Sequence, residues 1–132
     1  MSRANVNALL EHFAATNEGD FPKAMTYYDE DVVLVVDENA FLDAGTFTGR
    51  DAVGKWFGDW FSTFERGYSF EIEETRDLGD AVFFVATHYG RGRSSGVEVR
   101  GQTGYVYTFR DGKIIRAELY RDRASALEAA GL

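Results

Sequence analysis

Two histidines, His12 and His88, carry the side chains of this chain that titrate nearest to neutral pH. His88 stands near the end of a predicted strand whose six preceding residues, 82–87, are uncharged and mostly apolar. There it could act as a general acid or base, or be a polar residue at a pocket mouth or hydrogen-bonded in the core. His12 follows Leu9 by three residues on the apolar side of a predicted helix. It is therefore either a ligand-binding group or a histidine that its neighbours satisfy.

Asp37 is the carboxylate whose position favours proton transfer. It ends a predicted strand of apolar residues, and a carboxylate at the rim of an apolar pocket has a pKa that rises toward a useful value. The alternative is an ordinary polar turn, because Glu38 and Asn39 follow it directly.

Tyrosines could complete such a site. Tyr105 and Tyr107 point to the predicted core face of a long strand, where a hydroxyl can donate a hydrogen bond to a carbonyl or an enolate. A buried tyrosine can equally be one whose hydroxyl has found a partner in the core. Tyr27 and Tyr28 could approach the same pocket from a short second helix.

The composition is that of a single folded domain. The 132 residues include 45% hydrophobic and 15% aromatic residues, enough for one sizeable core. The net charge of −8 disfavours nucleic acid as a partner, because such binding depends on neutralising phosphates. No apolar run approaches the roughly 20 residues that span a bilayer, and the first residues lack a signal-peptide pattern. We therefore expect a cytoplasmic protein that has no membrane partner.

Metal and cofactor sites are not expected. Cysteine is absent, which excludes disulfides and thiolate chemistry. The two histidines have no carboxylate at ligand spacing, so they do not make a metal site. The segment 90–96 is rich in glycine and arginine but has no following helix, so it is typical of a hairpin connection rather than of a phosphate loop.

The first half of the chain predicts three helices. Residues 4–18 carry apolar side chains at the spacing of one helical face, and Gly19 ends that helix. Asp20 is placed to cap a short second helix with Pro22 in its first turn. Residues 48–51, Thr-Gly-Arg-Asp, have a capping-box pattern and open the third helix.

The third helix has the richest apolar face, with residues at helical spacing: Val53, Trp56, Phe57, Trp60, Phe61 and Phe64. Trp56 and Trp60 are expected to form core or pocket wall. Gly54 and Gly58 lie one turn apart on a neighbouring face. Each lowers helix propensity by about 1 kcal/mol relative to alanine, which favours close packing at that face.

Strand patterns occupy the rest of the chain. Residues 31–37 predict a strand that is apolar on both faces, and 46–48 a short edge segment within the irregular stretch 38–47. Residues 68–77 alternate. The segment 80–122 predicts a meander of three long strands, with Asp-Gly at 111–112 as a hairpin signal.

The parity of the meander predicts which face is the core. Odd-numbered side chains of the last two strands face inward, including Tyr105, Tyr107, Ile115 and Leu119. The strand at 81–89 is apolar on both parities, so one of its faces is expected to meet another subunit, and we expect a homodimer. The segment 125–131 predicts a last helical turn or two.

These elements predict an α+β fold in one domain, residues 1–132. Three helices from the N-terminal half would pack on a strongly curved, mostly antiparallel sheet. The resulting cone-shaped barrel would enclose a pocket for a small hydrophobic molecule.

Four segments resemble the SnoaL-like family of the nuclear transport factor 2-like, or ketosteroid isomerase-like, superfamily: 17–20 (Asn-Glu-Gly-Asp), 45–50 (Gly-Thr-Phe-Thr-Gly-Arg), 107–114 (Tyr-Thr-Phe-Arg-Asp-Gly-Lys-Ile) and the tail 120–131. The resemblance covers nearly the whole chain and implies the cone-shaped fold. The superfamily includes isomerases, polyketide cyclase-like enzymes, epoxide hydrolases, dehydratases and non-catalytic binders, so the fold alone does not give the reaction.

The resemblance also implies roles for single positions. His88 resembles the position of a cavity carboxylate in limonene-epoxide-hydrolase-like members. His12 resembles the place of an oxyanion-stabilising tyrosine in ketosteroid-isomerase-like members, and Asp37 lies close to their proton-abstracting carboxylate. Tyr105 aligns with an acidic hydrogen-bond donor of the same members.

Two positions depart from the family pattern. Leu119 stands where cyclase-like and hydrolase-like members carry a catalytic aspartate on the last strand. Ala86 stands where hydrolase-like members carry an arginine that pairs with the cavity carboxylate. Neither mechanism therefore transfers intact, and we expect an apolar, aromatic cavity.

Two functions stay open. The first is an enzyme that uses no cofactor and transfers protons on a hydrophobic, carbonyl-containing ligand, with His88 and Asp37 as acid and base and Tyr105 polarising the carbonyl. The second is a binding or dimeric interaction module without turnover, whose pocket would be lined by residues on the core face: His12, Tyr28, Trp56, Trp60, Tyr107 and Leu119. If His88 and Asp37 open onto one pocket, the enzyme is favoured.

Overall fold

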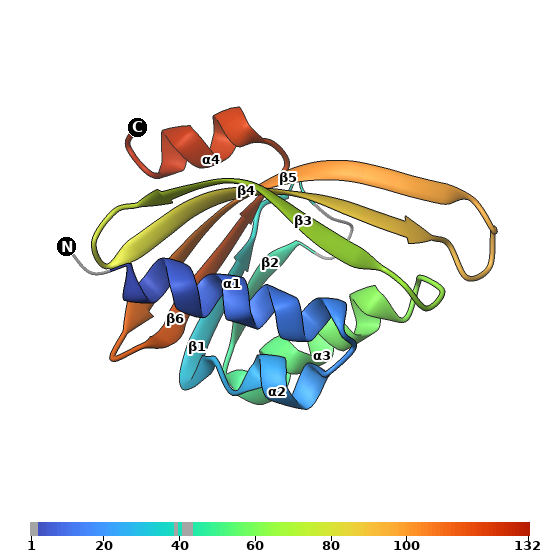
Figure 1. Ribbon diagram of the computed structural model, residues 1–132, viewed down its shortest axis with the longest axis horizontal. Helices are drawn as coiled ribbons and strands as arrows, with labels where there is room; N and C mark the ends of the chain where they lie inside the picture. The colour runs from blue at the N-terminus through green and yellow to red at the C-terminus, as the bar shows by residue number, and fades with distance from the viewer. Residues whose placement is uncertain (1–2, 39, 41–43) are drawn as a thin grey trace.

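The computed structural model describes residues 3–38, 40 and 44–132, which form four helices and a six-stranded sheet (Figure 1). The helices are α1 (Ala4–Asn17), α2 (Phe21–Met25), α3 (Arg50–Phe61) and α4 (Arg123–Ala129). The strands are β1 (Tyr28–Val36), β2 (Gly45–Thr48), β3 (Ser69–Asp77), β4 (Ala81–Arg91), β5 (Glu98–Arg110) and β6 (Lys113–Tyr120). Of the stretch predicted to be irregular, residues 39 and 41–43 lie outside the described part.

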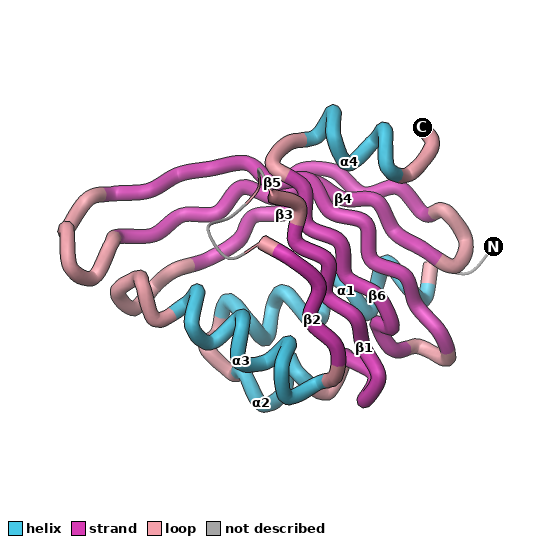
Figure 2. Tube along the Cα trace, turned by 180° about the vertical axis from the view of Figure 1, so that it is seen from behind, coloured by secondary structure: helices cyan, strands magenta, loops and turns pink. Residues whose placement is uncertain are grey.

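The sheet is mixed and open. Its strand order is β2-β1-β6-β5-β4-β3, with β1 parallel to β6 and every other neighbouring pair antiparallel. Helices α1, α2 and α3 lie against one face, and α4 lies against the other (Figures 1 and 2). The predicted α+β fold, with helices on a curved and mostly antiparallel sheet, is confirmed.

The turn between β5 and β6 is the predicted hairpin. Arg110 pairs with Lys113, and the two residues between them have positive φ angles, 52° at Asp111 and 78° at Gly112. Two consecutive positive φ angles are typical of a type I′ turn, whose twist matches that of antiparallel strands. Asp-Gly accommodates both angles at little strain, so the sequence sets the register of the two strands.

The main core lies between the sheet and helices α1 and α3. Even-numbered residues of β1 and β4 meet odd-numbered residues of β5 and β6 there, as parity predicted for the last two strands. Leu9, Leu34 and Phe84 have no measurable exposure. This core holds the curved sheet against the helices and leaves its end toward α2 and α3 unfilled.

A second apolar cluster lies on the opposite face. Phe83, Val85 and Val106 pack against Ala126 of α4. The backbone of α4 comes close because position 104 is glycine: an added Cβ would lie 2.5 Å from the carbonyl oxygen of Asp122. The apolar outer side of β4 is thus covered by α4 of the same chain. The apolar face of β4 is therefore not a reason to expect contact with another subunit, and the homodimer stays a prediction.

The start of α3 differs from the predicted capping box. Gly49 precedes the helix with φ 95°, and no side chain caps the first turn. Thr48 belongs to β2, where it pairs with Val33. Because Gly49, with its positive φ, lies between strand and helix, Thr48 is not the residue that caps α3, and the capping position is a glycine.

A bulge shifts the parity of β6 at its start. Phe109 pairs with Ile114, and the register changes between Thr108 and Phe109. Ile114 is therefore fully buried, whereas Ile115, which alternation placed in the core, is half-buried. An extra residue in one strand exchanges the two faces locally, which alternation alone does not reveal.

Two expectations of close packing were also wrong. A Cβ on Gly58 would have nothing within 4 Å, so this glycine packs against no neighbour there. In β1, Val33 and Val35 are half-buried rather than buried, because no helix covers the outer face of that strand (Figure 1). A Cβ added to Gly54 would lie 3.4 Å from Cε of Met25, an ordinary contact distance.

Candidate functional site

A cavity of about 870 Å³ lies between the concave face of the sheet and the helices α1, α2 and α3. Its wall includes seven of the nine residues expected at the site: His12, Tyr28, Trp56, Trp60, Tyr105, Tyr107 and Leu119. The exposed lining residues mark the mouth, between the end of α1 and the segment after α3. A cavity of this size suits a small molecule of several fused rings.

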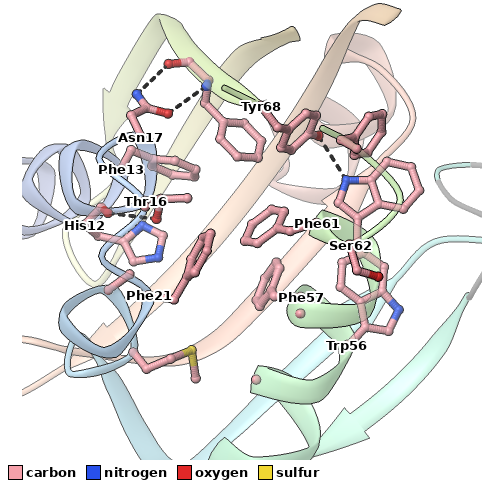
Figure 3. A pocket seen from close by; sticks show the side chains of 18 of the residues that line it. His12, Phe13, Thr16, Asn17, Phe21, Trp56, Phe57, Phe61, Ser62 and Tyr68 are labelled. Carbon is pink, nitrogen blue, oxygen red and sulfur yellow. Dashed lines mark hydrogen bonds between the residues drawn. The ribbon is translucent and has the colours of Figure 1, made fainter. Parts of the chain in front are cut away.

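The side wall of the cavity is aromatic. Along α3, Trp56, Phe57, Trp60 and Phe61 recur at helical spacing and line the space. The ring of Phe61 stacks on that of Phe21 from α2, with centroids 5.1 Å apart (Figure 3). Such surfaces bind the faces and edges of other rings.

His12 is a deeply buried polar group of the wall. Only 4% of its surface is exposed, and its Nδ1 atom has no hydrogen-bond partner among the described residues. The rings of Phe13 and Tyr28 contact it edge-on at centroid distances of 4.6 and 5.1 Å. Burial lowers the pKa of His12 to about 3, so the imidazole is uncharged at neutral pH. It can donate or accept one hydrogen bond but is a weak base.

Three tyrosine hydroxyls share the inner end of the cavity with His12. Tyr28 and Tyr107 interact through their side chains, and burial raises the pKa of both. Burial also raises the pKa of Tyr105, as do the hydroxyls of Tyr107 and Tyr68. Tyr28 is the first residue of β1, not part of the second helix as expected. These hydroxyls stay protonated and can donate hydrogen bonds.

At the mouth, side-chain hydrogen bonds connect elements that are separate in the sequence. Asn17 at the end of α1 exchanges two hydrogen bonds with the backbone of Phe70, of 2.8 and 2.9 Å (Figure 3). Arg93 donates to the carbonyl oxygens of Ser62 and Phe64 after α3. Arg93, which belongs to the segment predicted to be a hairpin connection, is therefore a residue of the mouth.

The charged lining residues are confined to this mouth. Glu18, Glu65, Arg66 and Arg93 line the cavity, and all four are exposed. The inner wall offers aromatic rings, Leu119 and uncharged polar groups. Among the described residues, no three His, Asp or Glu side chains are grouped as metal ligands would be.

His88 lies behind the cavity wall rather than in it. It is 8% exposed and does not line the cavity. Its Nδ1 atom is 3.0 Å from the hydroxyl oxygen of Tyr68, which does line the cavity and which accepts a 2.9 Å hydrogen bond from Nε1 of Trp60. Burial lowers the pKa of His88.

Asp37 does not line the cavity either. It follows β1 with the parity of Val33 and Val35. On the outer side of β6, burial raises the pKa of Tyr120, and the carboxylates of Glu118 and Asp37 raise it further. The structure therefore does not bring Asp37 and His88 together on one pocket.

Sequence reasoning missed Tyr68 as a site residue. Its alternation with Phe70 and Ile72 was recognised, but no role in the site was assigned to it. The strand begins one residue later, and the ring of Tyr68 stacks on Phe64 with centroids 4.2 Å apart. The sequence did contain a signal for this contact: an aromatic residue, Phe64, closes the predicted helix, and another, Tyr68, opens the strand that follows.

The sequence model of the SnoaL-like domain matches residues 9–117, which is most of the chain. The chain belongs to the SnoaL-like family. The family assignment agrees with the order of elements and with the cone of sheet and helices around one cavity. A comparison with curated proteins gave no match. None of the described helices has the length and apolarity needed to cross a membrane.

Solved structures share this SnoaL-like fold. TerC, which was co-crystallised with polyporic acid, superposes with a TM-score of 0.75 at 20% identity over 96% of each chain. A hypothetical protein with a ketosteroid isomerase-like fold from Catenulispora acidiphila DSM 44928, in complex with trimethylamine, gives 0.72 at 22% identity, over 93% of this chain and 92% of that one. A candidate SnoaL-like polyketide cyclase from Jannaschia sp. CCS1 gives 0.76 at 18% identity, over 89% and 84%. At these identities the likeness shows the fold.

Proposed function

We propose that this SnoaL-like protein binds a small, uncharged, ring-containing compound with a carbonyl group, and that it holds the compound without chemical turnover. The observation that carries the proposal is the distribution of charge. Every charged lining residue is at the exposed mouth, whereas the inner wall is aromatic with neutral hydrogen-bonding groups. Burying an ion in such a wall is strongly unfavourable, so the ligand enters uncharged.

The inner polar groups favour a carbonyl on the ligand. Tyr28 and Tyr107 share a side-chain hydrogen bond that uses one of their two hydroxyl hydrogens. The other hydroxyl of this pair, the hydroxyl of Tyr105 and the neutral ring of His12 can donate to a ligand. A carbonyl oxygen accepts two such bonds, and it would relieve the unpartnered His12. The complex of TerC with polyporic acid supports the choice of small organic molecules as ligands of this fold.

A ligand screen tests the binding proposal. Thermal shift and native mass spectrometry would compare 2-acetyl-6-hydroxynaphthalene and related aromatic ketones with aliphatic ketones of equal size. We expect aromatic ketones to stabilise the protein and to form one-to-one complexes with each chain. Gly58→Trp adds a ring at a position with open space around it and should weaken binding, whereas Gly58→Ala should not. Absence of any complex with aromatic ketones would contradict the proposal.

Proton transfer on the bound carbonyl is the second candidate. The observation in its favour is the unpartnered Nδ1 of His12 beside donating tyrosines. A neutral imidazole next to a carbonyl can polarise it even when it is a weak base. In D₂O, NMR would follow exchange of the acetyl protons of the same ketone. Exchange accelerated by the protein and lost in His12→Gln would favour the enzyme, and unchanged exchange would favour binding without turnover.

The protein also forms a homodimer in this proposal, through the outer face of β1. Helix α4 contacts β4, β5 and β6 but leaves the outer side of β1 without a helix (Figure 2). Val33 and Val35 present apolar surface there. Light scattering of the purified protein should give a dimer that Val35→Asp converts to a monomer, and a monomeric wild type would contradict this.

A further inference from the structure

The Tyr68 ring is fixed at the cavity wall by its neighbours. It stacks on Phe64, with an angle of 10° between the rings. On β4, an added Cβ at Gly90 would lie 2.6 Å from Cδ1 of Tyr68, so only glycine leaves room for the ring. Figure 3 shows Tyr68 on the opposite side of the cavity from His12, with Phe61 between them. The Tyr68 hydroxyl is therefore a second polar position, separate from the inner end.

The direction of one hydrogen bond at this hydroxyl follows from the chemistry of its donor, Trp60, and the direction of the other depends on the tautomer of His88. The indole Nε1 of Trp60 can only donate, so the Tyr68 oxygen accepts at 2.9 Å. His88 Nδ1 lies 3.0 Å away on the other side. Burial favours the uncharged imidazole. A neutral ring whose Nδ1 accepts carries its proton on Nε2, and the hydrogen of the Tyr68 hydroxyl then points to His88.

We propose that Tyr68 is a ligand-binding residue that offers the cavity a hydrogen-bond acceptor and no donor, and that His88 is the positioning residue that makes it so. With Trp60 donating to the oxygen and His88 taking the hydroxyl hydrogen, one lone pair is left for the ligand. This inference rests on the proposed function and narrows the range of compounds that the cavity would bind. A compound with a hydroxyl at the Tyr68 end and a carbonyl at the His12 end satisfies both positions.

The ring of His88 fits in its position because the residue opposite it, on β5, is a glycine. It pairs with Gly101 on β5, where an added Cβ would lie 2.6 Å from Nε2 of His88. Substitution of Gly101 displaces the histidine without altering any cavity-lining side chain, since Gly101 does not line the cavity.

The charged groups of the neighbouring strands lie on the other face. Glu71 of β3 accepts a hydrogen bond from Tyr89, and the guanidinium of Arg100 on β5 lies 5.7 Å from the centre of the Tyr89 ring. Tyr89 is adjacent to His88 in β4 and so points away from it. In the segment before β3, Glu65 and Arg66 are exposed at the mouth. Desolvation is the cause of the lowered pKa of His88.

Protonation of His88 would reverse the local pattern. The Nδ1–H of the imidazolium would donate to the Tyr68 oxygen, and the tyrosine hydrogen would be released toward the cavity. Because burial lowers the pKa of His88 below its ordinary value of 6.5, this reversal is expected only in acidic solution and not at neutral pH. Ligand preference should therefore change with pH without any change in the cavity lining.

The test compares 2-acetyl-6-hydroxynaphthalene with 2-acetyl-6-methoxynaphthalene, which differ in one O–H donor. Isothermal titration at neutral pH should give the hydroxyl compound the tighter binding, by about 3- to 10-fold. Tyr68→Phe should abolish this preference while leaving the affinity for the methoxy compound within about twofold. His88→Leu and Gly101→Ala, which release the Tyr68 hydrogen, should each reduce the preference. In the wild type the preference should fall as His88 becomes protonated.

The outcomes separate this inference from the proposed function. If both compounds bind equally well to the wild type, or if Tyr68→Phe keeps the preference, the inference is overturned and the binding function stands. If neither compound binds, the proposed function fails and this inference with it. A preference that is lost in Gly101→Ala but independent of pH would refute the role of His88, because a merely structural histidine would not produce the titration.

Discussion

A Cβ atom on Gly101 would lie 2.6 Å from Nε2 of His88, the residue opposite it on β4. The histidine ring therefore occupies the space that a side chain at position 101 would need. The two residues form one packing unit, in which the absence of a side chain on β5 permits a ring on β4.

Gly101→Ala is expected to destabilise the fold by about 1–3 kcal/mol, the usual effect of overpacking. The effect should fall to near zero when His88 is replaced by alanine, since the clash is with the ring. Urea unfolding of the four proteins of this double-mutant cycle measures the coupling. An equal loss of stability in both backgrounds would show that the backbone, and not His88, limits position 101.

Gly58→Ala is expected to stabilise the protein by about 0.5–1 kcal/mol. An added Cβ has open space around it in α3, and alanine has the higher helix propensity. Thermal unfolding checks the change. Gly54→Ala, whose Cβ meets Met25 at 3.4 Å, is the matched comparison and should give a smaller gain. If Gly58→Ala destabilised the protein, position 58 would be less open than described.

His12 should make stability fall in mild acid. Its pKa is about 3 in the folded protein and 6.5 in the unfolded chain, so between these values the unfolded state binds more protons. The contribution of the neutral ring is complete above pH 6.5 and decreases by about 1.4 kcal/mol for each pH unit below it, until the pH approaches 3.

The measurement is urea unfolding from pH 7.5 to 5, with His12→Gln as the reference that lacks the titrating group. We expect the wild type to lose more stability than His12→Gln as the pH falls. In parallel, the ring proton signals of His12 should not titrate between pH 5 and 8. A signal that titrates with an ordinary histidine pKa would contradict the burial of the group.

The sequence predicted most of the fold, because amphipathic periods and turn residues are local properties. The alternation in β5 and the Asp111-Gly112 turn placed Tyr105, Tyr107 and Leu119 on the cavity face. A bulge near Phe109 is not local in this sense, since it depends on how two strands pair, and it moved the buried position from Ile115 to Ile114.

The candidate site was predicted less completely. The sequence placed His88 near the end of a buried strand, but the presence of Tyr68 in front of it depends on a ring from before β3 and on the glycines opposite. Asp37 was assigned from its place at the end of an apolar strand and from resemblance to the family, whereas the strand geometry gives it the parity of the outer face. Contacts between segments far apart in the chain decided both cases.

Helix α4 should detach from the sheet in Gly104→Ala. The added Cβ would lie 2.5 Å from the backbone oxygen of Asp122 and 2.7 Å from Cβ of Ala126, so the helix must move. Hydrogen exchange of the α4 amides should become faster, with a loss of about 1–3 kcal/mol in global stability. Gly101→Ala serves as the control that should leave α4 exchange unchanged. Unchanged exchange in Gly104→Ala would show that the sheet, rather than the helix, adjusts.

The restriction of charge to the mouth has a consequence for ligands that are themselves weak acids. A phenol that has lost its proton would meet both acidic and basic side chains at the mouth and no cation on the inner wall. Only its protonated fraction would occupy the cavity. Above neutral pH, the apparent affinity for such a compound would fall about tenfold for each pH unit beyond the compound's own pKa. The pH above which binding weakens would then differ from one ligand to the next, although the protein is the same.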